Sequence, residues 1–202
     1  MFNYKNVVSI LNRHTYSFHR QHCNAYLRTR GEEGVGRGVE HIYVHGNYND
    51  NTSAFNIALL KLTKPFNLST TTAVSLASRD SPVEDCFVTG RTNITSSSRD
   101  TMQFVRSAVT IISRDECERQ TGHVILPSEI CAQQTNATVI YSKDKGGLLI
   151  CENNGSDRLV GVLSPILQYD NSTVPIIFSW LPYYIPWIES VKAWSDEGGP
   201  VG

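Results

Sequence analysis

The chain has 202 residues, of which 40% are hydrophobic and 18% are charged. This length fits a single domain, and this composition supplies enough apolar side chains for a hydrophobic core. Eighteen Lys and Arg residues against nineteen Asp and Glu residues give a net charge of -1, which argues against the basic surface of a nucleic-acid-binding protein. No segment approaches the roughly 20 consecutive apolar residues that a membrane-spanning helix requires.

Short β-rich segments separated by polar turns run along most of the chain. Segments rich in β-branched, aromatic and other apolar residues are predicted to be strands: 41–44, 56–62, 86–89, 103–112, 148–151, 159–163 and 176–181. Segments rich in Asn, Ser, Thr and Gly are predicted to be the turns between them: 47–52, 92–98 and 153–156. Many short strands with few helical patterns predict an all-β sandwich or barrel.

The C-terminal segment follows a different pattern. Trp187, Val191 and Trp194 stand at positions i, i+4 and i+7. This spacing predicts an amphipathic helix over residues 185–194, which packs its aromatic side chains on the barrel. Residues 196–202 are rich in glycine and are expected to form a flexible tail.

Six Asn-x-Ser/Thr triplets indicate a glycosylated, secreted surface. They begin at Asn51, Asn67, Asn93, Asn136, Asn154 and Asn171. A composition rich in Asn, Ser and Thr is the alternative explanation for so many triplets.

The five cysteines agree with secretion where they form disulfides, but an odd number leaves one of them without a partner within the chain. Residues 1–6 contain no apolar segment of the length that a signal peptide needs. Either a preceding segment is absent from this chain or the product is not exported.

Several motifs resemble those of the trypsin-like serine proteases, the S1 family with the chymotrypsin fold. Residues 55–62 read Phe-Asn-Ile-Ala-Leu-Leu-Lys-Leu, which resembles the family's Asn-Asp-Ile-Ala-Leu-Leu-Lys-Leu. Residues 86–90 read Cys-Phe-Val-Thr-Gly and are similar to the family's Cys-x-Val-Thr-Gly. Further similar segments follow the family's order at residues 45–49, 113–117, 130–132, 146–151, 159–164 and 183–188.

The resemblance implies two six-stranded antiparallel Greek-key β-barrels, a C-terminal helix, and an active site in the cleft between the barrels. The domain is expected to span residues 6–195, with the tail at 196–202. Its first barrel is expected to be incomplete at the N-terminus, because the family's Ile-Val-Gly-Gly opening strand does not precede Asn6.

The resemblance also implies which cysteines pair. Disulfides are expected between Cys86 and Cys151 and between Cys117 and Cys131. Cys23 is expected to be unpaired, because its partner's position in the family is occupied here by Asn6.

Acyl transfer by this family needs a serine nucleophile, a histidine base, a carboxylate and backbone donors for the oxyanion. Where the family reads Gly-Asp-Ser-Gly-Gly-Pro, residues 143–148 read Lys-Asp-Lys-Gly-Gly-Leu. The nucleophile position is therefore Lys145, whose ammonium has no lone pair with which to attack. The oxyanion-hole position is Lys143, whose Cβ disfavours the backbone conformation of that site.

The other two triad positions are Asn56 and His22. Asn56 replaces the carboxylate, and an amide cannot stabilise the imidazolium that forms on the base. His22, followed by Cys23, is aligned with the general base, while His14 and His19 are read as solvated loop residues.

Two serines near the expected site do not restore a nucleophile. Ser142 lies three residues before the nucleophile position, too far along the loop to take its place. Ser164 corresponds to the strand that pairs with the substrate backbone and is read as structural.

Specificity and activation also differ from the family pattern. Val139 stands at the floor of the primary pocket, where trypsins carry aspartate, and Tyr141 replaces a cysteine beside the pocket. Asp144 keeps the aspartate that receives the new N-terminus on activation, but no matching N-terminal segment is present. Asp144 is expected to pair with Lys143 or Lys145, or to remain solvated.

These observations predict a catalytically inactive serine protease homologue, which is secreted and acts as a decoy or cofactor in a proteolytic pathway. Its partners are expected to be proteases, inhibitors or protease substrates, with no nucleic acid, cofactor, metal or membrane span. One alternative is an active trypsin-like endopeptidase, which requires a nucleophile that the sequence does not offer. Another is an N-terminally incomplete product of a protease-homologue gene.

Overall fold

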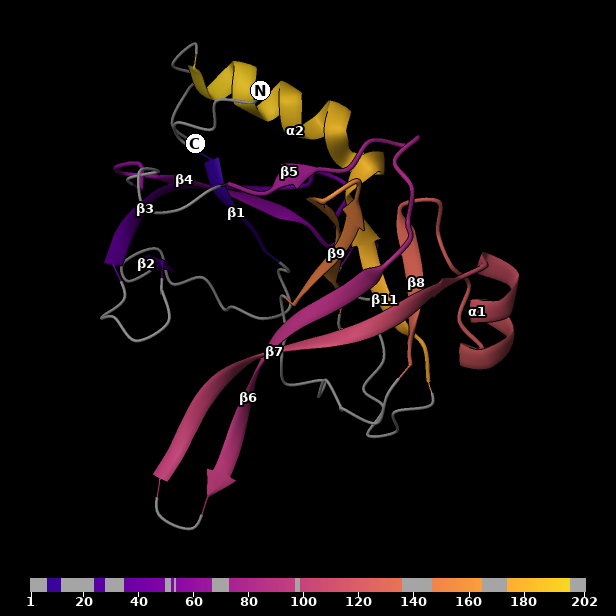
Figure 1. Cartoon of the computed structure of the whole chain (residues 1–202). Coiled ribbons are helices and arrows are strands. Elements are labelled where there is room, and N and C mark those ends of the chain that lie inside the picture. Colours follow the sequence, from indigo (N-terminus) through magenta and orange to yellow (C-terminus); the bar gives the residue numbers. More distant parts are fainter. Residues whose placement is uncertain are drawn as a thin grey trace.

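Strands dominate the computed structural model, which describes residues 7–11, 24–27, 35–49, 52, 54–66, 73–96, 99–135, 147–164 and 174–196 (Figure 1). The elements are β1 (Val7–Leu11), β2 (Asn24–Leu27), β3 (Val35–Val44), β4 (Ala58–Leu62), β5 (Ser75–Leu76), β6 (Cys86–Ser96), β7 (Arg99–Ile112), α1 (Arg114–Thr121), β8 (Glu129–Gln134), β9 (Leu148–Asn153), β10 (Ser156–Leu163), β11 (Ile176–Trp180) and α2 (Leu181–Asp196). Each of the seven predicted strand segments overlaps an observed strand. The strands β1, β2, β5 and β8 were not predicted from local pattern.

The N-terminal half forms an antiparallel sheet with the strand order β1-β4-β3-β2. The central strand β4 buries Ala58, Leu59, Leu60 and Leu62, because its nearly continuous apolar run is covered on both faces. This sheet has four strands within the described residues, fewer than the six of a complete barrel in the family pattern.

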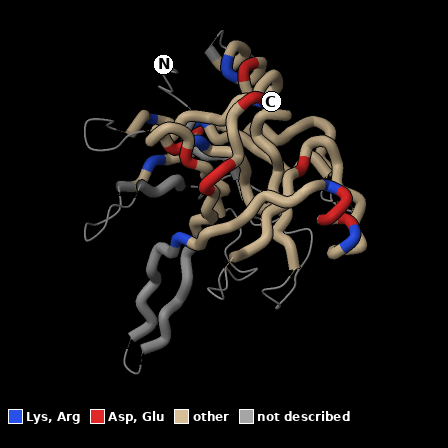
Figure 2. Tube along the Cα trace, turned by 45° about the vertical axis from the view of Figure 1, so that its right-hand side comes forward, with Lys and Arg blue, Asp and Glu red and all other residues tan. Residues whose placement is uncertain are grey.

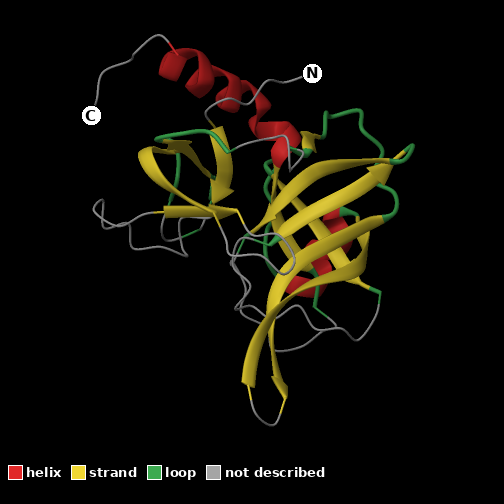
Figure 3. Ribbon diagram, turned by 60° about the vertical axis from the view of Figure 1, so that its left-hand side comes forward, coloured by secondary structure: helices red, strands yellow, loops and turns green. Residues whose placement is uncertain are grey.

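The C-terminal half forms a closed six-stranded antiparallel barrel. Its strand order is β11-β8-β7-β6-β9-β10, and β10 closes the ring by pairing with β11. The short strand β5 adds to β10 in parallel orientation. The barrel interior contains Val88, Leu149, Val160 and Phe178, each fully buried. Figure 3 shows the barrel beside the smaller sheet, and the all-β fold with a C-terminal helix is as predicted.

A separate core cluster joins the sheet, the barrel and the helix. It contains Ile57 and Leu59 from the N-terminal half, Val162 from β10, and Tyr184 and Ile188 from α2. Burial of apolar surface is the main favourable term in folding, so this shared cluster fixes the two halves against each other.

The helix α2 confirms the predicted C-terminal helix but begins four residues earlier, at Leu181. Sequence periodicity missed this start because Pro182 lies next to it, whereas proline is tolerated in a first helical turn. Pro186 lies inside the helix. Trp194 makes an edge contact with Tyr43 of β3, with ring centroids 5.7 Å apart. The helix therefore packs aromatic side chains on the sheet.

The strands β6 and β7 form a long hairpin whose register runs from Cys86 opposite Val109 to Ser96 opposite Arg99. Only residues 86–89 of β6 also pair with β9, and only residues 109–112 of β7 also pair with β8. The rest is a two-stranded ribbon that extends away from the barrel (Figures 1 and 3). The predicted turn at 92–98 was wrong for residues 92–96, which continue β6, because cross-strand pairing satisfies their backbone groups and threonine favours strands.

The helix α1 was not predicted, although its capping residues are visible in the sequence. Ser113 is the N-cap, and its Oγ accepts a hydrogen bond from the backbone N–H of Glu116 at 3.2 Å. Gly122 ends the helix at φ 68 and donates its N–H to the carbonyl of Glu118. A serine followed three residues later by glutamate is the pattern of a capping box.

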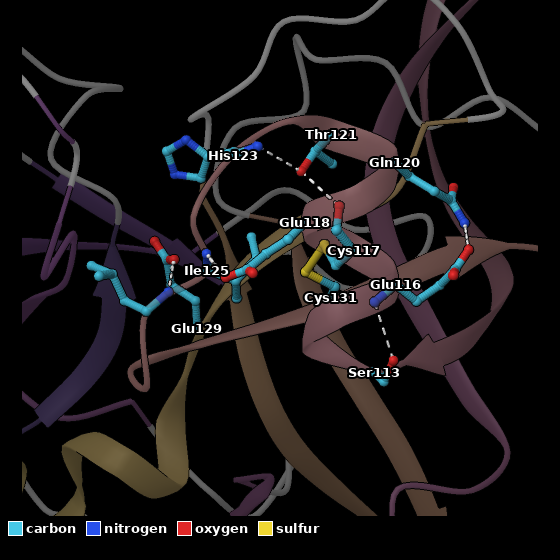
Figure 4. The surroundings of a disulfide bond; sticks show 11 residues. Ser113, Glu116, Cys117, Glu118, Gln120, Thr121, His123, Ile125, Glu129 and Cys131 are labelled. Carbon is cyan, nitrogen blue, oxygen red and sulfur yellow. Dashed lines mark hydrogen bonds between the residues drawn. A yellow bond between two sulfur atoms is a disulfide. The ribbon is translucent and has the colours of Figure 1, made fainter.

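Both predicted disulfides are present. Cys86 and Cys151 lie directly opposite each other on β6 and β9, with Cα atoms 4.0 Å apart. Cys117 of α1 is bonded to Cys131 of β8, with Cα atoms 6.3 Å apart (Figure 4). The second bond fixes α1 to the outside of the barrel.

Basic and acidic residues are interspersed over the described part of the chain, and α1 carries both signs (Figure 2). Among the described residues, no helix is long and apolar enough to cross a membrane.

A close approach between β10 and β11 predicts the effect of a small substitution. A Cβ at Gly161 would lie 2.9 Å from Cβ of Phe178 and 3.2 Å from the carbonyl of Ser179. We expect Gly161→Ala to reduce the free energy of unfolding by about 1–3 kcal/mol, because the added methyl group overpacks the barrel closure.

Chemical denaturation measures this effect against Gly46→Ala, whose added Cβ would meet no heavy atom within 4 Å. The control is expected to stay within about 0.5 kcal/mol of the unaltered chain. Equal stability of the two variants would contradict the packing argument.

Candidate functional site

Asn56, the residue at the predicted carboxylate position, lies immediately before β4 where the two halves of the molecule meet. It is 2% exposed. Its backbone carbonyl accepts a hydrogen bond from Oγ of Ser179 on β11, at 3.0 Å. A strand of the C-terminal barrel is therefore bonded directly to the residue at the predicted triad position.

The backbone around Asn56 is a tight turn. Ile57 donates its N–H to the carbonyl of Phe55 at 2.8 Å, an i to i+2 bond typical of a γ-turn centred on Asn56. Phe55 has a φ of 54, a left-handed conformation that costs a residue with a side chain on the order of 1–3 kcal/mol. Such strain persists only where the surrounding packing fixes the residue.

An aromatic cluster fixes Phe55. Its ring stacks on that of His45 at the end of β3, with centroids 4.9 Å apart and an interplanar angle of 13°. The His45 ring also contacts Trp187 at 5.0 Å and Tyr184 at 5.6 Å, both on α2. The cluster thus joins α2 to the turn that carries Asn56.

The surroundings of His45 favour its neutral form. Burial lowers the pKa of its imidazole, and its Nδ1 accepts a hydrogen bond from the backbone N–H of Asn47 at 3.2 Å. The unprotonated Nδ1 is required for that bond, so both effects favour the uncharged ring.

Two further buried groups lie on the barrel side. Burial raises the pKa of the Tyr184 hydroxyl to about 12, so this residue remains neutral. Burial also raises the pKa of the Glu129 carboxyl, whose Oε2 accepts the backbone N–H of Leu126 at 2.8 Å (Figure 4). Glu129 acts here as a cap for the turn that precedes β8.

The loop after the nucleophile position is held by β10. Leu163 donates its N–H to the carbonyl of Gly147 at 2.8 Å, and Gly147 is buried. Ser164, the next residue, is 5% exposed and donates its N–H to the carbonyl of Ile177 at 2.9 Å. The end of β10 is therefore bonded to Gly147 on one side and to β11 on the other.

Most of the predicted site residues lie outside the described residues. These are His22, Cys23, Val139, Lys143 and Lys145, together with His14, His19, Tyr141, Ser142 and Asp144. The sequons at Asn51, Asn67, Asn136 and Asn171 also lie outside them. Asn93 lies within β6, and Asn154 is exposed in the turn between β9 and β10.

No group of three or more His, Cys, Asp or Glu side chains in the described part of the chain could hold a metal ion.

A comparison with protein families identifies the family to which this fold belongs. The family model described as Trypsin matches residues 15–188. The chain belongs to the trypsin family. The match runs from before β2 to Ile188 in α2, so it includes β2, β3 and β4 of the sheet, the barrel and the junction that carries Asn56. The chain is therefore a serine-protease-like protein.

The aromatic cluster around His45 and the Ser179–Asn56 bond are features of this trypsin-family fold that local sequence reasoning missed. The residues Tyr183, Tyr184 and Trp187 are visible in the sequence. The contacts of the two tyrosines with Phe55 and of Trp187 with His45 depend on how α2 folds back onto the sheet.

The state of His45 predicts a pH dependence. Because the folded state favours neutral His45, whose ordinary pKa is 6.5, this contribution to stability is complete above that pH. It decreases as the pH falls through the lowered folded pKa. A His45→Phe variant keeps a ring in the cluster but cannot bind a proton. We expect its Tm to fall less than that of the unaltered chain between about pH 7 and pH 5.

Thermal unfolding of both proteins across this range measures the difference. Parallel Tm profiles for the unaltered chain and the variant would contradict a role for His45 protonation.

Proposed function

We propose that this trypsin-family chain is a non-catalytic, secreted homologue that binds proteins of a proteolytic pathway without cleaving them. The observation that carries the proposal is the identity of residue 145. Lys145 stands between Asp144 and Gly146, where the family motif has its nucleophilic serine.

The chemistry of lysine supports this proposal. At neutral pH the ammonium group has no electron pair with which to attack a carbonyl. A neutral lysine would form a stable amide in place of the labile ester through which a serine protease turns over.

The environment of Asn56 gives a second line of support. In the family, a carboxylate at this position and the protonated base stabilise each other's charge during turnover. The neutral amide of Asn56 fits a buried position without that stabilisation, because burying an unpaired charge is costly. It also leaves the base without the group that orients it and stabilises its charged form.

The two disulfides and an exposed glycosylation sequon support secretion. The two disulfides, Cys86–Cys151 and Cys117–Cys131, are of the kind that persists in oxidising compartments. The sequon at Asn154 occupies an exposed turn, which is accessible to the glycosylation machinery.

The proposed partners are proteases, their inhibitors or their substrates. The trypsin fold supports this choice by analogy at the level of the fold. The mixed surface charge and the net charge of -1 favour protein partners over nucleic acid.

Labelling with a fluorophosphonate probe tests the loss of catalysis. The probe reacts covalently with the activated serine of a serine protease, so we expect no labelling of the unaltered chain under conditions where active trypsin is labelled fully. A Lys145→Ser/Asn56→Asp variant measured in parallel shows whether the remaining site, including Lys143, still permits attack.

Covalent labelling of the unaltered chain, mapped to a serine by mass spectrometry, would establish an active endopeptidase in place of the proposed homologue. Absence of labelling with a correctly folded sample, verified by both disulfides, is the expected result.

Glycosylation tests the proposed compartment. Expression through a eukaryotic secretory pathway is expected to attach an N-glycan at Asn154, since its turn is exposed. Enzymatic deglycosylation followed by intact-mass measurement should then show one glycan fewer in Asn154→Gln than in the unaltered chain. Equal numbers of glycans would show that this sequon is not used.

A further inference from the structure

In the ribbon that β6 and β7 form, one side of β7 faces away from β6. This outer edge of β7 is the subject of the inference. Along the ribbon, β7 pairs with β6 on one side. On its other side, β8 pairs with residues 109–112, and Thr135 donates its backbone N–H to the carbonyl of Ala108 at 3.2 Å. Within the part of the chain that the structure describes, no strand pairs with this side of residues 99–106.

The sequence along this edge favours strand pairing. Residues 101–105 read Thr-Met-Gln-Phe-Val and carry no charge, and β-branched and aromatic residues favour strands. An edge of this kind offers backbone N–H and C=O groups to another strand, and an uncharged run of this composition is prone to association unless it is covered.

Charges of opposite sign stand at the two ends of the uncharged run. Asp100 precedes it and Arg106 follows it. In an antiparallel pairing of this edge with itself, centred on Gln103, position 100 of one copy lies opposite position 106 of the other. Because the two copies are related by a two-fold axis, Asp100 of each copy lies opposite Arg106 of the other. This register therefore produces two Asp–Arg pairs.

We propose that the β7 edge of this chain pairs with the β7 edge of a second copy, antiparallel and centred on Gln103. The two ribbons form a continuous four-stranded sheet in the order β6-β7-β7-β6. Positions 101 and 105 lie opposite each other, as do positions 102 and 104, which places Met opposite Phe. This inference does not depend on whether the chain is catalytic.

Arg106 is exposed at the barrel end of the ribbon and contacts β6 in the single chain. Its guanidinium carbon lies 3.4 Å from the centroid of the Phe87 ring, and Phe87 is 5% exposed while Arg106 is exposed. To meet the partner's Asp100, the Arg106 side chain turns from β6 toward the outer edge of β7.

The opposite edge of the ribbon does not have the same self-complementarity. In residues 90–96 of β6, Arg91 is the single charged residue, so no antiparallel pairing of this edge with itself opposes unlike charges. The same edge also carries the Asn93 sequon, and a glycan there would hinder pairing through β6. These two features favour β7 as the associating edge.

Charge reversal tests the proposal. Sedimentation velocity of the full chain, from micromolar to millimolar concentration, is expected to show a concentration-dependent dimer. Asp100→Arg and Arg106→Asp each place like charges opposite each other, and each is expected to weaken dimerisation by about tenfold or more. The double variant Asp100→Arg/Arg106→Asp restores the opposite charges and is expected to restore the dimer.

Asp157→Arg provides a matched control, because Asp157 is exposed on β10, away from the ribbon. This variant is expected to dimerise like the unaltered chain. Because Arg106→Asp removes the contact with Phe87, folding of each variant is verified by its Tm. Hydrogen exchange of the unaltered chain provides a readout without substitution, and amides in residues 100–106 are expected to gain protection as concentration rises.

Three outcomes would overturn the proposal: a monomer at every concentration, a dimer that both single reversals leave unchanged, or a double variant that remains monomeric while folded. Concentration-dependent protection of residues 90–96 in place of 100–106 would assign the contact to β6 and would also overturn it.

Discussion

Three residue pairs between β10 and β11 close the C-terminal barrel, and the geometry of the site depends on this closure. The pair Val162–Ser179 places Ser179 where its hydroxyl reaches the carbonyl of Asn56. Gly161 permits the close approach of the two strands, because a side chain there would meet Phe178. Since α2 begins directly after β11, the same closure also determines where the helix starts and therefore where its aromatic side chains meet the N-terminal sheet.

The sequence predicted strands best where apolar runs are buried on both faces, as in β4 and β10, and less well where pairing alone defines the strand. Residues 92–96 resemble a turn in composition, yet they form a strand because β7 lies opposite them. The two-residue strand β5 has no pattern of its own and exists through its pairing with β10. In α1 the capping signal of Ser113 and Glu116 was present in the sequence, so that helix could have been predicted.

Part of the candidate site was predictable from resemblance to the family, not from local sequence pattern. The positions of Asn56 and of the four paired cysteines followed from resemblance, because collinear motifs fix which residues a shared fold brings together. Local sequence reasoning could not predict the stacking of His45 on Phe55, or the buried turn cap formed by Glu129. Both depend on contacts between segments that the sequence does not mark as neighbours, since burial and ring packing arise only when α2 and the barrel have assembled.

The Cys86–Cys151 bond has a consequence for limited proteolysis. It joins residues with a sequence separation of 65, and the β6–β7 hairpin, α1, β8 and residues 136–146 all lie between them. A single backbone cleavage within this interval therefore produces a nicked, two-chain molecule that remains one covalent species until it is reduced. A chain of this family that meets proteases could be cut there while β6 and β9 stay cross-linked.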